Sequence, residues 1–87
     1  MNRIIIHGGP VNPMLHVYVY VDGEKIDSLG CQMDALEEIV FTLAQKHNIN
    51  TIDLAGSKMY MTGIEKMLRE SSTMANYSVN IIEFRYV

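Results

Sequence analysis

The segment LHVYVYV at residues 15–21 limits the possible folds more than any other part of this sequence, because its side chains alternate strictly. Successive side chains of a β-strand point to opposite faces, so Leu15 and the valines share one face while His16, Tyr18 and Tyr20 share the other. A period of two excludes a helix here. The segment predicts a strand with a valine face suited to packing against helices and an amphipathic face that meets solvent, a ligand or a second subunit.

A tight hairpin follows this strand. Asp22-Gly23 is a dipeptide preferred in two-residue type I′ turns, where both central residues need positive φ. We expect the return strand over Glu24 to Leu29. The predicted register puts Ile26 on the valine face and leaves the two tyrosines beside Lys25 and Asp27. The expected pairs are Val21 with Glu24, Tyr20 with Lys25, Val19 with Ile26, Tyr18 with Asp27 and Val17 with Ser28.

Three more strands are expected elsewhere in the chain. Arg3 to His7 is a short apolar strand, and the glycines and prolines of Gly8 to Pro13 predict a loop after it. Thr51 to Ala55 reads as a short strand, and Tyr77 to Val87 as a long strand at the end of the chain.

Two helices are expected between these strands. Apolar residues recur three and four apart over Asp34 to His47, with Asp34 and Glu37 as a capping box and Asn48 suited to a left-handed C-terminal position. The second helix ends at Glu70 to Thr73 and has two possible starts. It could be capped by Ser57 or by the capping box that Thr62 opens, and we prefer the second, with residues 58–61 irregular or forming one loose turn.

These elements define one α/β domain over residues 1–87 with the order βββαβαβ. The hairpin signals make the first three strands an antiparallel meander. Each helix then returns the chain by a right-handed crossover, so the later strands run parallel to the first. We therefore expect a five-stranded mixed sheet with both helices packed on one face.

This element order resembles the ribonuclease H-like fold without its later helices. Enzymes of that family hold divalent metal with carboxylates from the first strand, the first helix and the end of the fourth strand. Glu37, Glu38 and Asp53 lie near the second and third of these places, but the first strand, Arg3 to His7, has no carboxylate. The resemblance therefore implies a degenerate metal site.

Composition narrows the functional classes. The chain is 48% hydrophobic and 20% charged with a net charge of -3, which is typical of a globular domain and too acidic for a generic phosphate-backbone binder. No apolar run approaches the roughly 20 residues of a membrane span, and the N-terminal segment lacks the apolar region of a signal peptide. Cys31 has no second cysteine to pair with, which favours the reducing cytoplasm.

Other chemical motifs are incomplete, and we expect no cofactor and no metal. Gly56-Ser57-Lys58 precedes a helix, as a phosphate-binding loop does, but without the spacing of a P-loop. Cys31 reads as a packing residue, and the three histidines are too scattered to predict a metal site. Met59, Tyr60 and Met61 are interpreted as a deformable contact surface, so residues 56–61 form a second candidate binding loop.

The leading functional hypothesis is a small non-catalytic module, an accessory or regulatory protein, that forms a homodimer or binds a larger protein through its tyrosine-bearing face. Tyrosine with mixed charge is typical of protein interfaces. The alternative is a ligand- or nucleic-acid-binding domain using the same face or the 56–61 loop, or a degenerate nuclease-like domain. The binding residues predicted on the face are His16, Tyr18, Tyr20, Lys25, Asp27 and Arg85.

We predict that the protein has no nuclease or hydrolase activity of its own, because the first strand lacks a carboxylate and no base–nucleophile pair is present. The measurement is cleavage of DNA and RNA with magnesium or manganese. Metal-dependent cleavage that Asp53→Asn abolishes would contradict the prediction.

Overall fold

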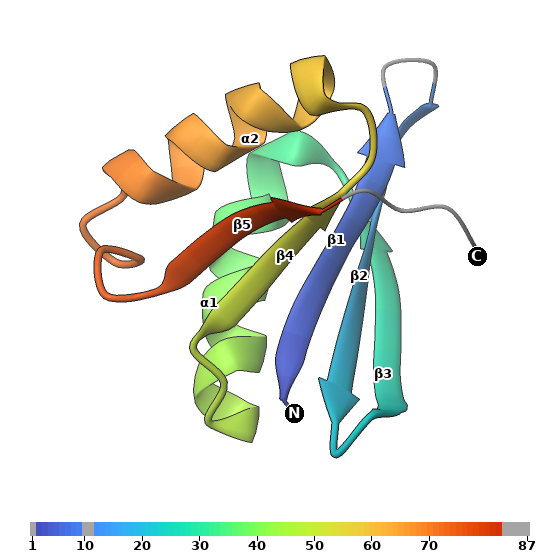
Figure 1. The fold of residues 1–87 in the computed structure, drawn as a ribbon, viewed down its shortest axis with the longest axis vertical. Coiled ribbons are helices and arrows are strands. Elements are labelled where there is room, and N and C mark those ends of the chain that lie inside the picture. The colour runs from blue at the N-terminus through green and yellow to red at the C-terminus, as the bar shows by residue number, and fades with distance from the viewer. Residues whose placement is uncertain (1, 10–11, 83–87) are drawn as a thin grey trace.

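The computed structural model describes residues 2–9 and 12–82 of the chain. It confirms the predicted α/β class and the element order βββαβαβ (Figure 1). In chain order the elements are β1 (Arg3–Gly9), β2 (Asn12–Val21), β3 (Glu24–Cys31), α1 (Met33–His47), β4 (Thr51–Ala55), α2 (Lys58–Glu70) and β5 (Ser78–Ile82).

The five strands form one mixed sheet in the order β3-β2-β1-β4-β5. β2 runs antiparallel to both β1 and β3, whereas β4 is parallel to β1 and β5 is parallel to β4. The meander and the two parallel crossovers are therefore as the sequence predicts. Both helices pack against one face of this sheet, where a single core cluster joins side chains of α1, α2 and the strands (Figure 1).

Strand alternation selects the residues of this core. Ile4 and Ile6 of β1 point to the helices, and so do Val17 and Val19 of β2, as the valine face predicts. Leu36 and Val40 of α1 and Ile64 and Leu68 of α2, spaced at helical intervals, cover them. The largest fully buried side chains of the described residues are Ile4, Ile6, Leu15, Leu36, Ile52, Leu54, Met61, Ile64, Leu68, Met74, Val17 and Val19.

The hairpin turn is placed as predicted, but the predicted register is wrong beyond its first two pairs. Asp22 and Gly23 both have positive φ, at 55° and 80°. A β-bulge then inserts Ile26, so that Asp27 lies opposite Val19, where Ile26 was expected. Asp27 consequently shares the valine face and Ile26 is 47% exposed.

The strands are longer than predicted around the first connection. β1 continues through Gly8 and Gly9, and β2 begins at Asn12, with Gly9 paired to Asn12 after an irregularity in the register. Most of the predicted loop is therefore strand. β3 likewise runs to Cys31. Of the last predicted strand, residues 78–82 are strand, and residues 83–87 lie outside the described part of the chain.

The start of α1 does not use the predicted capping box. The helix begins at Met33 after Gln32, whose side chain makes no capping hydrogen bond. Glu37 instead accepts a hydrogen bond of 2.7 Å from the Ser71 hydroxyl, which ties α1 to the end of α2. The C-terminal prediction is confirmed, since Asn48 is left-handed at φ 55° and ψ 52°.

The preferred start of α2 is wrong, and the Ser57 alternative is correct. The Ser57 hydroxyl accepts a hydrogen bond from the Tyr60 N–H, so residues 58–61 are helical. Thr62 lies inside the helix, and its hydroxyl donates to the Lys58 carbonyl at 2.7 Å. Burial of Met61 in the core favours the earlier start, because this side chain needs the first helical turn to reach the sheet.

We predict that Gly23→Val lowers stability by about 1 to 3 kcal/mol, because a β-branched side chain is disfavoured at positive φ. A Cβ atom at Gly23 would have no neighbour within 4 Å, so the cost is conformational rather than steric. The melting temperature measures the effect. Gly23→Asn is the control and should lose less, since asparagine tolerates this conformation. Equal melting temperatures for the valine variant and the unmodified protein would contradict this account.

Candidate functional site: the tyrosine face

The face of the sheet opposite the helices carries the predicted aromatic residues. We call it the tyrosine face and define it by His16, Tyr18 and Tyr20 of β2 with the basic residues Lys25 of β3 and Arg3 of β1. Strand register brings them together, because Tyr20 lies between Lys25 and Arg3 on the neighbouring strands. The sheet therefore assembles this group from three strands.

One of the predicted site residues, Asp27, is not part of this group. Asp27 is turned to the valine face by the bulge at Ile26, which corrects the prediction that it lies beside the tyrosines. Ser28, which is opposite Tyr18, takes that place. Arg85 lies outside the described residues.

Each tyrosine ring has a cation near its face. The Lys25 Nζ lies 5.2 Å from the centroid of the Tyr18 ring, and the Arg3 guanidinium carbon lies 5.8 Å from that of Tyr20. Both distances are within the range of cation–π attraction. His16 stacks beside Tyr18, with ring centroids 6.4 Å apart and planes at 12°. These contacts place two cations and the His16 imidazole beside the tyrosine rings.

Arg3 also forms an ion pair across the sheet. Its Nη1 lies 3.1 Å from Oδ2 of Asp53, whose carboxylate is almost completely buried in β4. Tyr20, Arg3 and Asp53 therefore form a row across β2, β1 and β4. The ribonuclease H-like resemblance suggests Asp53 only as a metal ligand. The sequence does hold a clue to the ion pair: Asp53 is the one charged residue in the short strand 51–55, and a buried carboxylate needs a cation such as Arg3 of the first strand.

The carboxylates expected from the ribonuclease H-like resemblance do not gather. Asp53 is paired with Arg3, Glu37 with Ser71, and Glu38 is exposed on α1. Among residues 2–9 and 12–82, no group of three histidine, cysteine or acidic side chains is arranged to hold a metal ion.

The histidines are closer than the sequence suggested. His7 of β1 and His16 of β2 are direct cross-strand partners, so two of the three share one region of the tyrosine face. The sequence pattern did not predict this pair, because the register between β1 and β2 depends on the length of the connection between them. His47 is the last residue of α1, where its Nε2 is buried and has no hydrogen-bond partner among the described residues.

Cys31 is a packing residue in this structure. It is 6% exposed at the end of β3 and belongs to the core cluster. Burial raises the pKa of its thiol, and the nearby Asp34 carboxylate raises it further. A thiol with a raised pKa holds its proton at neutral pH and is a poor nucleophile.

The second candidate loop, residues 56–61, is split between surface and core. Met61 is fully buried, which corrects its interpretation as contact surface, whereas Met59 is 91% exposed and Tyr60 is partly buried against the core. A Cβ atom on Gly56 would lie 2.6 Å from the Gly8 carbonyl oxygen, so glycine is required for close packing of this turn on β1. Its role there is structural.

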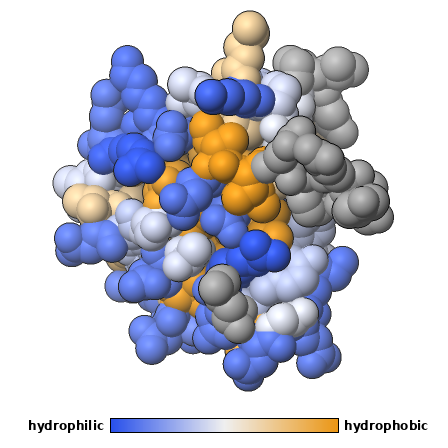
Figure 2. All heavy atoms as spheres, in the orientation of Figure 1, coloured by the Kyte–Doolittle hydropathy of each residue, from blue (hydrophilic) through white to orange (hydrophobic). Residues whose placement is uncertain are grey.

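A surface pocket of about 470 Å³ lies beside this turn, lined by Gly56, Ser57, Lys58, Ile81 and Ile82. Figure 2 shows apolar side chains gathered near the centre of the same view as Figure 1, with hydrophilic ones around them. The pocket has one basic side chain and no buried polar group among its lining residues. Its lining residues offer apolar contact area but do not include a group of side chains arranged for catalysis.

Comparison with known proteins gives no relative. No protein-family model, no curated protein and no solved structure matches the chain. Neither helix of the described residues is long and apolar enough to cross a membrane.

We predict that Arg3→Met destabilises the fold by about 1 to 3 kcal/mol, because it leaves the buried Asp53 carboxylate without its cation. Urea denaturation measures the free energy of unfolding. In the double variant with Asp53→Asn, the cost should be smaller than the sum of the two single changes, since no unpaired charge remains. Strictly additive costs would show that the pair is not coupled.

Proposed function

We propose that this chain is a small non-catalytic interaction module that associates with a second copy of itself through the tyrosine face. The observation that carries the proposal is the position of Tyr18 and Tyr20 on the side of the sheet that the helices do not cover, each with a cation at its ring. Tyrosine and arginine are enriched where protein interfaces concentrate their binding energy.

The order of this face supports association with a protein. Arg3 lies over Tyr20 while paired with Asp53, and Lys25 lies over Tyr18. A side chain that is already paired, as Arg3 is, loses less conformational entropy when a partner binds. Burial of the ring surfaces would contribute about 25 cal/mol per Å² of apolar area.

A second copy is the favoured occupant for two reasons. An 87-residue domain buries a limited share of its surface and gains stability from a partner. A two-fold axis lets one self-complementary patch serve both subunits, and this face carries aromatic rings and cations together, so that the cations of one copy can contact the rings of the other. The ring hydroxyls would bond polar groups of the facing subunit.

Nucleic acid is the weaker candidate for this surface. A single-strand platform combines aromatic rings with cations that are free to contact phosphate. Arg3 and Lys25 are the basic residues of the tyrosine face within the described part of the chain, and both are engaged by rings, Arg3 also by a carboxylate.

The wider assignment remains part of the proposal. We infer an accessory or regulatory role in a larger assembly, a place in the reducing cytoplasm from the lone Cys31, and a degenerate relationship to the ribonuclease H-like fold from the element order. An ion-paired Asp53 in place of a carboxylate cluster supports a binding role over nuclease chemistry.

We expect Tyr18→Glu combined with Tyr20→Lys to shift the protein from dimer toward monomer, because the two changes remove both rings and keep the net charge. Size-exclusion chromatography with light scattering measures the mass. The matched control is Ser72→Glu with Gln45→Lys, two exposed positions outside the sheet, which should leave the mass unchanged. An unmodified protein that is monomeric at high micromolar concentration would overturn self-association.

A further inference from the structure

A second surface lies at the edge of the sheet where β3 is the outermost strand. A groove of about 320 Å³ separates this strand from α1 and is lined by Leu29, Glu38, Ile39, Thr42 and Leu43. We call it the β3 groove. Its floor and wall are mainly apolar, and Leu29 and Ile39 are only partly buried. The helix layer therefore leaves core-facing side chains accessible next to β3.

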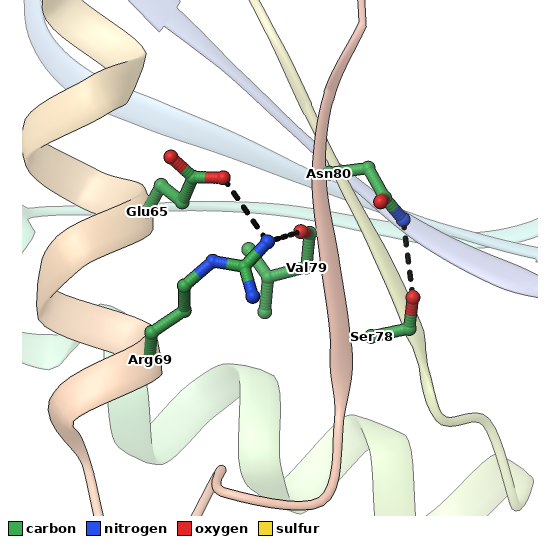
Figure 3. A network of polar contacts seen from close by, with 5 residues as sticks. All are labelled: Glu65, Arg69, Ser78, Val79 and Asn80. Carbon is green, nitrogen blue, oxygen red and sulfur yellow. Dashed lines mark hydrogen bonds and ion pairs between the residues drawn. The ribbon is translucent and has the colours of Figure 1, made fainter.

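Each outer strand of the sheet has a main-chain group bonded to a side chain, the Val79 carbonyl of β5 to Arg69 and the Ser28 N–H of β3 to Asp27. At the β5 edge, the Arg69 guanidinium of α2 donates to the Val79 carbonyl and to the Glu65 carboxylate, so a main-chain acceptor of the outer strand is occupied (Figure 3). Within the described residues β3 pairs with β2 alone. An edge strand directs alternate N–H and C=O groups outward, and these can pair with an added strand.

The regular part of this edge is Asp27 to Cys31. The bulge at Ile26 interrupts the ladder near the hairpin, whereas from Asp27 onward each residue has one partner on β2. Asp27, Leu29 and Cys31 point to the helix side, since they are paired with Val19, Val17 and Leu15. An added strand would therefore place every second side chain toward the β3 groove.

The charge of this surface selects the partner. Asp27 lies on the helix side of β3 and Glu38 lines the groove. Asp34 lies near Cys31 at the end of β3, and α1 has no basic residue before Lys46. A second copy paired here would bring the same carboxylates toward one another. An extended segment with lysine or arginine complements them.

We propose that the β3 edge binds an extended segment of another protein by strand addition. The segment has an apolar side chain that enters the β3 groove against Leu29 and Ile39, flanked on the same face by lysine or arginine toward Asp27 and Glu38. This surface is separate from the tyrosine face, so one chain can bind its own copy and this partner at once.

The test uses the full chain and a capped peptide with the core lysine-threonine-isoleucine-threonine-lysine, extended by threonines. Nuclear magnetic resonance titration should shift the backbone amides of residues 27–31 and of the facing side of α1, and the peptide should slow hydrogen exchange in β3. The same peptide with glutamate for lysine should bind more weakly. Titration of the variant Tyr18→Glu with Tyr20→Lys should give the same result, which keeps this test independent of self-association.

Glu38→Lys should weaken binding of the lysine peptide by roughly two- to fivefold, as expected for an exposed ion pair. Glu70→Lys makes the same charge change on an exposed position of α2 and is the matched control, with binding unchanged. Three results would overturn the proposal: no shifts at millimolar peptide, equal binding of the glutamate peptide, or shifts confined to the tyrosine face. Exchange protection of β3 that rises with protein concentration alone would assign the edge to a second copy and overturn it as well.

Discussion

The burial of isoleucines on both faces of β1 is the constraint on which the rest of the structure depends. Ile4 and Ile6 contact the helices, while Ile5 on the opposite face is only 2% exposed between Tyr18 of β2 and Asp53 of β4. A strand that is apolar on both sides is most stable at the centre of a sheet. With β1 at the centre, β2 and β4 are its neighbours and β3 and β5 are the edge strands.

The central position of β1 also builds the tyrosine face. Arg3 lies at the start of β1, where it can reach Tyr20 on one neighbouring strand and Asp53 on the other. The ion pair holds the guanidinium over the ring without exposing the Asp53 carboxylate. The face therefore combines aromatic rings with cations that the strand register and one ion pair place beside them.

One inserted residue separates the charges of the two surfaces. Without the bulge at Ile26, Asp27 would lie opposite Tyr18 and next to Lys25, on the tyrosine face. With it, Asp27 turns to the helix side, where Glu38 makes the β3 groove acidic. The same bulge displaces Ile26 into solvent and interrupts the strand edge near the hairpin, a common way to restrict edge pairing. Lys25 remains with the tyrosines.

Local sequence patterns were sufficient to predict the element types, their order and the two faces of β2, because side-chain alternation and helical spacing are local consequences of backbone geometry. The turn at Asp22-Gly23 and the left-handed Asn48 were also predictable, since few residues accept positive φ. Tertiary structure decided the bulge at Ile26, the Ser57 start of α2 and the Arg3 to Asp53 pair. Each of these depends on which distant side chains gain by burial or pairing, and that balance is set only when the strands and helices pack together.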